Sequence, residues 1–146
     1  TAVQALVDHA RLRSDMRVLV IGAAGGVGHF AVQFAHHAGA RVTATCGPDN
    51  VAFVASLGAD AVLDYTREDA TRPAAPYDVV FDVAGRSSWR AMRNALAPEG
   101  VYLNTSGDAG AVVATIGERL APPRDGTIRG IGTVGSLPAT YCMTFI

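Results

Sequence analysis

The sequence predicts an α/β fold, a doubly wound parallel sheet of about six strands with helices on both faces. Short apolar runs without alternation, such as "RVLVIG" at 17–22, are typical of strands that are buried on both faces. Segments with helical spacing follow these runs, and short connections that contain glycine separate them. Strand–helix units repeated in this way favour right-handed crossovers, and 146 residues suit one domain, at 1–146.

The expected elements alternate along the chain. Strands are expected at 17–22, 41–46, 61–65, 78–83 and 100–107, with a sixth at 141–146. Helices are expected at 1–12, after the glycines up to Gly39, at 50–58, at 87–100 and at 110–121. In the helix at 87–100, Ser87 or Ser88 would be the cap, and Pro98 and Gly100 would end it.

Three of these helices carry apolar residues at helical spacing. In the first helix, one face carries Val3, Leu6, Val7 and Ala10. In the second, the same spacing joins Val27, Phe30, Ala31, Phe34 and Ala35. In the helix at 87–100 it joins Trp89, Met92 and Leu96, which we interpret as core residues.

Composition and charge exclude several functional classes. Twelve basic against thirteen acidic residues give a net charge of −1, which leaves no electrostatic footprint for nucleic acid or an anionic membrane. The uncharged stretch 18–40 is long enough to span a bilayer, but its crowded glycines and later polar side chains argue against a span. Cys46 and Cys142 are expected to be buried free thiols, which suits a cytoplasmic protein.

The stretch "GAAGGVG" at 22–28 lies between a predicted buried strand and a predicted helix. Gly22 would permit the tight turn, Gly25 and Gly26 would let the backbone approach a phosphate, and Gly28 would let the helix pack on the strand. The free N–H groups of the first helical turn would attract an anion. The alternative is that the glycines serve packing alone. The order strand, loop, helix and strand favours a dinucleotide site.

Taken together, these segments resemble a known family. The stretches "RVLVIGAAGGVGHFAVQFAHHAGARVTATC", "SLGADAVLDYTRED", "YDVVFDVAG" and "GVYLNTSG" are similar to the nucleotide-binding Rossmann domain of medium-chain dehydrogenase/reductases. The length of the glycine loop resembles the zinc-independent, quinone oxidoreductase-like branch. The resemblance implies hydride transfer between NAD(P)H and a quinone or an activated alkene. It also implies a separate catalytic domain, so we expect this chain to be a fragment that is inactive alone and holds no catalytic residue.

The choice between NADP and NAD depends on the end of the second strand. That position is Cys46, which is neither an acid nor a base, while Asp49 is either a ribose-binding acid or a turn residue. Relatives that use NADPH often employ a tyrosine at the end of the third strand, which Tyr65 matches, and Arg67 would add charge. NADP(H) is therefore favoured over NAD(H). Asn50 is either a ribose contact or the cap of the next helix.

The cofactor should cross the carboxyl ends of the strands, which adds the loops at 83–85 and 105–107. The candidate cofactor-binding residues are Gly22, Ala24, Gly25, Gly26, Val27, Gly28, Cys46, Asp49, Asn50, Tyr65, Val83, Ala84, Gly85, Thr105, Ser106 and Gly107. No metal site is expected, because no ligand set surrounds the histidines of the second helix.

Two alternative functions remain open. In the first, the chain is an enoyl reductase segment of a polyketide or fatty-acid synthase. In the second, it is a nucleotide-binding module without catalysis. Short-chain dehydrogenases are disfavoured, because the chain contains no lysine and so no Tyr-x-x-x-Lys motif. The apolar segment at 141–146 would allow a homodimer through an edge strand.

Overall fold

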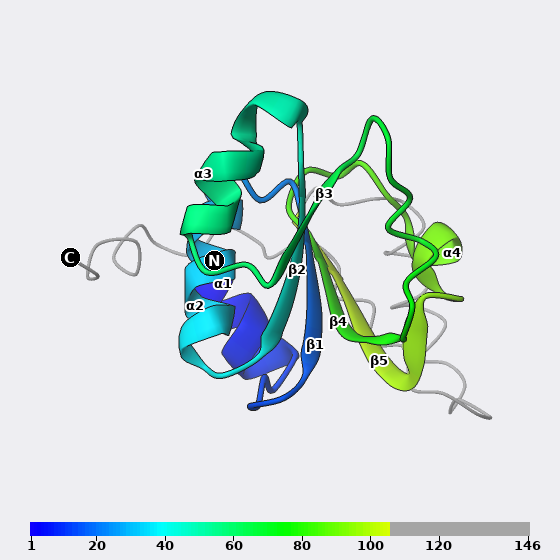
Figure 1. The fold of residues 1–146 in the computed structure, drawn as a ribbon. Helices are drawn as coiled ribbons and strands as arrows, with labels where there is room; N and C mark the ends of the chain where they lie inside the picture. The colour runs from blue at the N-terminus through cyan, green and yellow to red at the C-terminus, as the bar shows by residue number, and fades with distance from the viewer. Residues whose placement is uncertain (106–146) are drawn as a thin grey trace.

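The computed structural model describes residues 1–105 (Figure 1). Its helices are α1 (Ala2–Gln4), which continues as the π-helical η1 (Ala5–His9), α2 (Gly28–His37), the 3₁₀ turn η2 (Pro48–Asn50), α3 (Val51–Ser56) and α4 (Trp89–Met92). Its strands are β1 (Arg17–Ile21), β2 (Arg41–Cys46), β3 (Ala61–Asp64), β4 (Tyr77–Asp82) and β5 (Leu96–Asn104).

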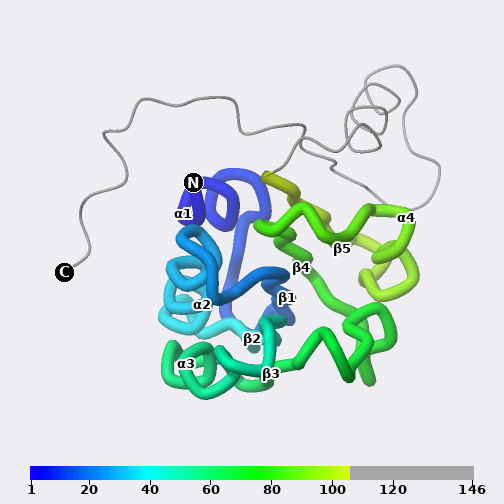
Figure 2. The backbone as a smooth tube through the Cα atoms, turned by 90° about the horizontal axis from the view of Figure 1, so that it is seen from above, coloured from blue at the N-terminus to red at the C-terminus, as the bar shows by residue number. Residues whose placement is uncertain are grey.

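The five described strands form one parallel sheet in the order β3-β2-β1-β4-β5. The chain order therefore reverses at β1, and a ligand in such a sheet lies at the carboxyl ends of the strands beside this switch point. The helices α1, α2 and α3 cover one face, and α4 lies on the other with the β3–β4 connection (Figures 1 and 2). The predicted doubly wound α/β fold is confirmed.

The two faces of the sheet have separate cores. Alternate strand residues point to opposite faces. Val18 and Val20 pack toward the face of α1, α2 and α3, in the larger of the two buried clusters. Leu19 and Ile21 pack on the other face with Met92 of α4. Helix α4 covers this second face with only four residues.

The buried faces of the first two helices differ from the predicted ones. In α1–η1, Leu6 and Ala10 are buried as predicted, but Val3 and Val7 are 40% and 45% exposed. Their place on the buried face is taken by Ala2 and Ala5. In α2, Phe30 is 47% exposed, whereas its buried residues are Gly28, Ala31, Val32 and Ala35. Small side chains line the contact, and their size allows the helix backbones to lie close to the sheet.

The helix predicted at 87–100 is wrong in its second half. Helix α4 ends at Met92, and β5 begins at Leu96, which pairs with Tyr77. The next pair joins Val79 to Val101, so residues 97–100 bulge from the ladder. Gly100 suits this bulge, because a Cβ there would lie 3.0 Å from the Tyr77 carbonyl oxygen. The predicted helix at 110–121 and the sixth strand at 141–146 lie outside the described residues.

Candidate nucleotide-binding site

The glycine loop follows β1 at the carboxyl edge of the sheet and is attached to both neighbouring strands. Gly22 has a φ of +84°, and a Cβ there would lie 2.7 Å from the Ala84 Cβ, so the loop after β4 presses against it. On the other side, the Gly22 N–H donates to the Thr45 Oγ1 at 3.4 Å. The Ala23 N–H donates to the Thr45 carbonyl at 3.0 Å.

The glycines of this loop do not share one explanation. A Cβ on Gly28 would collide with the Gly22 carbonyl oxygen and lie 2.8 Å from the Ala23 Cα. A Cβ on Gly25 would make an ordinary contact of 3.4 Å, and one on Gly26 would meet no atom within 4 Å. Packing among the described residues therefore requires Gly22 and Gly28 but not Gly26.

The amino end of α2 presents backbone donors beside Gly26. The Gly25 N–H donates to the Gly22 carbonyl at 3.1 Å, and the His29 N–H donates to the Gly25 carbonyl at 3.0 Å. Within residues 1–105, the N–H groups of Gly26 and Val27 have no acceptor. Such donors, together with the positive end of the helix dipole, can bind a phosphate that approaches an exposed glycine. Ala24 is half-buried in the same loop.

The loop after β4 is organised around Asp82, whose side chain is fully buried. Its Oδ1 accepts hydrogen bonds from the N–H groups of Ala84 (3.1 Å) and Arg86 (3.3 Å). Its Oδ2 accepts from the Ser87 N–H (2.8 Å) and the Tyr102 hydroxyl (3.2 Å). One strand-end carboxylate therefore shapes the loop that contains three of the candidate residues, 83–85.

The carboxyl end of β5 is bonded to the same loop. The Thr105 N–H donates to the Asp82 carbonyl at 3.3 Å, and the Thr105 Oγ1 donates to the Val83 carbonyl at 3.2 Å. The Val83 N–H donates in turn to the Ile21 carbonyl of β1 at 3.0 Å. Thr105 thus lies next to the other candidates, whereas Ser106 and Gly107 lie outside the described residues.

The carboxyl ends of β2 and β3 carry the candidates for the adenosine ribose. Cys46 is 2% exposed and its side chain belongs to the core, so only its backbone faces the edge. Its carbonyl accepts from the Tyr65 N–H at 3.2 Å. Tyr65 is 66% exposed, and its hydroxyl lies 3.2 Å from the position of a Cβ on Gly47. The phenol of Tyr65, the residue after β3, therefore covers the first residue after β2.

Asp49 and Asn50 lie in the exposed turn η2, immediately after Gly47. Asn50 occupies the N-cap position of α3, but its side chain makes no capping hydrogen bond. The capping alternative for Asn50 is thus correct in position and lacks the side-chain bond that would stabilise the helix.

Two ionisable groups at this edge have shifted pKa values. Burial, and then the negative charge of Asp64, raises the pKa of the Cys46 thiol, so the thiol stays protonated at neutral pH and is a poor nucleophile. The pKa of Asp64 is lowered by hydrogen bonds from the Thr66 N–H and hydroxyl, and further by Arg67. Asp64 therefore keeps a negative charge at the end of β3. Cys46 is a buried free thiol as predicted, whereas Cys142 lies outside the described residues.

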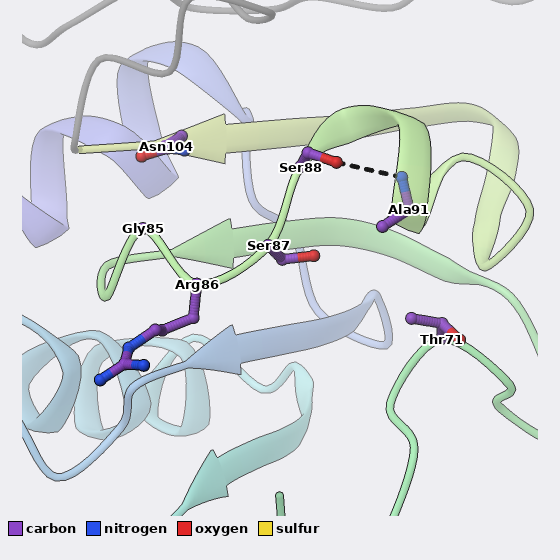
Figure 3. A pocket seen from close by; sticks show the side chains of 7 residues that line it. All are labelled: Thr71, Gly85, Arg86, Ser87, Ser88, Ala91 and Asn104. Atoms are coloured by element: carbon purple, nitrogen blue, oxygen red, sulfur yellow. Dashed lines mark hydrogen bonds between the residues drawn. The ribbon is translucent and has the colours of Figure 1, made fainter.

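A cleft of about 650 Å³ lies beside the loop after β4 (Figure 3). Its walls are Thr71, Gly85, Arg86, Ser87, Ser88, Ala91 and Asn104. The Arg86 side chain extends away from Ser87 and toward the end of β1, while Ser88 caps α4 by accepting from the Ala91 N–H at 3.3 Å (Figure 3). The candidate cofactor loop therefore also forms one wall of this cleft.

The histidines of α2 have local contacts. The His29 Nδ1 lies 3.0 Å from the Gly25 carbonyl oxygen, and the His36 ring lies against Gly58. Residues 1–105 contain no group of three or more His, Cys, Asp or Glu side chains arranged to hold a metal ion.

In residues 1–105, no helix has the length and hydropathy that crossing a bilayer requires.

Sequence reasoning missed Thr45 and Asp82 as organisers of the site. Asp82 is the last residue of β4, Thr45 comes just before the last residue of β2, and both are at most 5% exposed. A buried polar side chain requires hydrogen-bond partners, and a strand end offers them in the following loops. A polar residue that ends an apolar run is the signal that would have identified Asp82, whereas Thr45 is followed by the buried Cys46 and the same signal does not apply to it.

Comparisons with known proteins identify the family of this chain. Residues 26–141 match the family model described as zinc-binding dehydrogenase. The chain is 48% identical over 93 residues to the chloroplast envelope quinone oxidoreductase homolog of Arabidopsis thaliana, covering 58% of this chain and 28% of that protein. It is similar to the solved quinone oxidoreductase of Coxiella burnetii, with a TM-score of 0.71, 30% identity, and coverage of 82% and 38%. It is also similar to the CurK enoyl reductase, with a TM-score of 0.61, 32% identity, and coverage of 70% and 33%.

The chain spans about a third of the length of the curated relatives it matches, 28% of the first and 34% of the second. The family model begins within the glycine loop, at residue 26, and extends beyond the described residues to residue 141. The chain therefore belongs to the zinc-binding dehydrogenase family, as a nucleotide-binding domain of the medium-chain dehydrogenase/reductase type that is similar to quinone oxidoreductases.

Proposed function

We propose that this chain binds a nicotinamide dinucleotide, with NADP(H) preferred, in an oxidoreductase that transfers hydride to a quinone or an activated alkene. The observation that carries the proposal is Gly26. No neighbour requires a glycine there, yet the residue lies exposed beside two backbone N–H groups without acceptors in the described residues. A diphosphate that approaches this backbone explains both features.

The preference for NADP(H) rests on the ends of β2 and β3. The last residue of β2 is the buried Cys46, so no carboxylate stands at the position that usually binds a ribose 2′-hydroxyl. The exposed Tyr65 hydroxyl and the Arg67 guanidinium, 84% exposed, can instead contact a 2′-phosphate. Asp49 is the residue that would support NAD(H), since its carboxylate would repel the phosphate.

The test of cofactor binding is calorimetric titration of the 146-residue chain with NADPH and with NADH. We expect binding of both and tighter binding of NADPH. Gly26→Ala should weaken NADPH binding at least about tenfold, because the new methyl group occupies the approach of the phosphate. It should leave the unfolding temperature unchanged or higher, since alanine restricts the unfolded chain. Unchanged affinity in Gly26→Ala would contradict the phosphate role.

The test of cofactor preference is Tyr65→Phe. Loss of the hydroxyl should lower the NADPH-to-NADH affinity ratio roughly threefold, with NADH affinity unchanged. Asp49→Asn is the matched variant on the neighbouring loop. If NADH is the preferred cofactor and Asp49→Asn abolishes that preference, the chain is NAD-dependent.

Quinone or alkene reduction belongs to the whole enzyme, and we expect this chain to bind cofactor without turning over substrate. Hydride transfer requires a substrate held against the nicotinamide in a closed site. Turnover of an enone by the chain alone, at the rate of a complete enzyme, would overturn this expectation.

An enoyl reductase of a polyketide or fatty-acid synthase is the second candidate, favoured by the similarity to the CurK enoyl reductase. Carrier-protein domains in the same parent polypeptide would decide for it.

Three further features stay predictions. The cytoplasmic location rests on the thiol chemistry of the two cysteines. The homodimer rests on the segment at 141–146, outside the described residues, and sedimentation of the chain at high concentration tests it. The independence from zinc rests on the length of the glycine loop, and metal analysis of the complete enzyme tests it.

A further inference from the structure

We propose that Asp82 is a positioning residue for the dinucleotide, because its carboxylate holds the loop after β4 in the shape that receives the cofactor. The inference rests on the proposed function, since it concerns the same site. It adds a residue that contacts no part of the cofactor itself, because the Asp82 side chain is completely buried.

The hydrogen bonds of Asp82 determine the path of the loop. Three of its four donors are backbone N–H groups of the loop, those of Ala84, Arg86 and Ser87, at 2.8–3.3 Å. Within this turn Gly85 has a φ of +61°, a conformation that the surrounding hydrogen bonds hold in place. A carboxylate presents only acceptors, which matches N–H donors that converge from one side.

The same carboxylate connects the two halves of the site. Its Oδ2 accepts from the Tyr102 hydroxyl of β5 at 3.2 Å. On the other side, the bond from the Ala84 N–H holds the Ala84 Cβ only 2.7 Å from where a Gly22 Cβ would stand. Gly22 opens the glycine loop, so a shift of the loop after β4 would change the surface that a dinucleotide meets at both loops. Figure 3 shows the Arg86 side chain on this surface, extending toward the end of β1.

The chain offers a matched control on the same strand. Asp78 is the second residue of β4, and its Oδ2 accepts the Arg17 N–H at 2.7 Å. Both aspartates therefore bond backbone N–H groups, but Asp78 does so at the amino edge of the sheet, away from the glycine loop. Replacing each by asparagine makes the same chemical change at opposite ends of one strand.

The experiment compares the wild-type chain, Asp82→Asn and Asp78→Asn by calorimetric titration with NADPH, at a temperature where circular dichroism shows all three to be folded. An asparagine at 82 turns an N–H donor toward the loop N–H groups. We expect its NADPH dissociation constant to rise about tenfold, whereas that of Asp78→Asn stays within about twofold of wild type. At saturating NADPH, the fluorescence anisotropy of the bound dihydronicotinamide should fall in Asp82→Asn alone. A merely structural role would not change that bound-state signal in a folded variant.

Each result decides between two conclusions. If the wild-type chain binds NADPH and the two variants bind equally well, Asp82 has no positioning role while the proposed function stands. If the wild-type chain binds neither NADPH nor NADH, the proposed function fails, and this inference fails with it. If Asp82→Asn does not fold, Tyr102→Phe removes one of the four donors and should weaken NADPH binding roughly threefold. Unchanged affinity in Tyr102→Phe then overturns the inference.

Discussion

The two edges of the sheet use the same residue type for different purposes. At the amino edge, Asp60 and Asp78 each accept one backbone N–H, from Val42 and Arg17, both at 2.7 Å. These bonds join one strand entry to the next. At the carboxyl edge, Asp82 accepts four hydrogen bonds, and three of the donors lie in a single loop.

The aspartate that accepts the most hydrogen bonds is also the most deeply buried. Asp82 is fully buried, whereas Asp78 is half-buried and Asp60 is exposed. Burying a carboxylate costs free energy unless several hydrogen-bond donors compensate for its lost hydration. Several contacts therefore determine the position of the Asp82 carboxylate. At the amino edge, we therefore expect the aspartates to contribute to stability alone. At the carboxyl edge, the same chemistry sets the shape of a surface.

The largest effect is expected for Gly28→Ala at the carboxyl edge. The added methyl group would collide with the Gly22 carbonyl oxygen, which is backbone and cannot rotate away. We expect a loss of about 3 kcal/mol in the free energy of unfolding, measured by denaturant titration. At the amino edge, Gly39→Ala is the control: with a φ of +77° it should cost about 1 kcal/mol. Equal losses of unfolding free energy in the two variants would show that the two edges do not differ in how closely their glycines are packed.

The role of the glycine run could be predicted from the sequence, because turns and close packing depend on residues that are near in the chain. The run at 22–28 predicted the turn, the helix start and the close approach to the strand, and the structure has all three. The strands β1 to β4 were predicted within one or two residues. For β1 and β4, the apolar runs 18–21 and 79–81 suit central strands that are buried on both faces.

Features that depend on contacts between distant residues could not be predicted from the sequence. The segment at 96–100 contains Pro98 and Gly100, which locally predict the end of a helix, but pairing of Leu96 with Tyr77 makes it the start of β5. Phe30 has the spacing of a core residue and is half-exposed, since the sheet accepts smaller side chains at that contact. Asp82 depends on Tyr102, twenty positions away, and no local pattern shows that hydrogen bond.

A smaller effect is expected for Asp60→Ala at the amino edge. The Val42 N–H loses its acceptor, which should cost about 1 kcal/mol of unfolding free energy by denaturant titration. NADPH affinity should not change, because the bond lies at the edge opposite to the glycine loop. Asp60→Asn retains one acceptor oxygen and should recover part of the loss. A marked fall in NADPH affinity in Asp60→Ala would mean that both edges influence the site.

Next in size is the cap of α4, beside the cleft. Ser88→Ala removes one of the two acceptors of the Ala91 N–H, the hydroxyl at 3.3 Å, and leaves the Ser88 carbonyl at 3.1 Å. It should cost about 0.5 kcal/mol, the low end for a cap, on a helix of only four residues. Ser88→Thr, which keeps the hydroxyl, is the control. Because Asp82 holds the preceding residue, Ser87, we expect the cofactor loop to be unaffected and NADPH affinity to stay the same. A loss of affinity in Ser88→Ala would extend the carboxyl-edge network into α4.

The smallest effect concerns acid stability at the carboxyl edge. The pKa of Asp64 is lower in the folded chain, chiefly through the Thr66 N–H and hydroxyl, so ionised Asp64 stabilises the fold. That contribution is complete above the unfolded pKa of about 3.9 and is lost as the pH falls through the lower folded value. Thr66→Val removes the hydroxyl bond and should raise the pKa of Asp64, measured by NMR titration of its carboxyl carbon.

Asp69 provides the comparison, because its pKa is also lowered, chiefly by the hydroxyl and N–H of Thr71 in the β3–β4 connection. Thr71→Val should therefore raise the pKa of Asp69 and leave that of Asp64 in place. If both threonine variants moved both aspartates, the acid response would belong to the connection as a whole. Separate responses would place Asp64 with Asp82, as a second carboxylate that shapes a loop at the carboxyl edge through its own local hydrogen bonds.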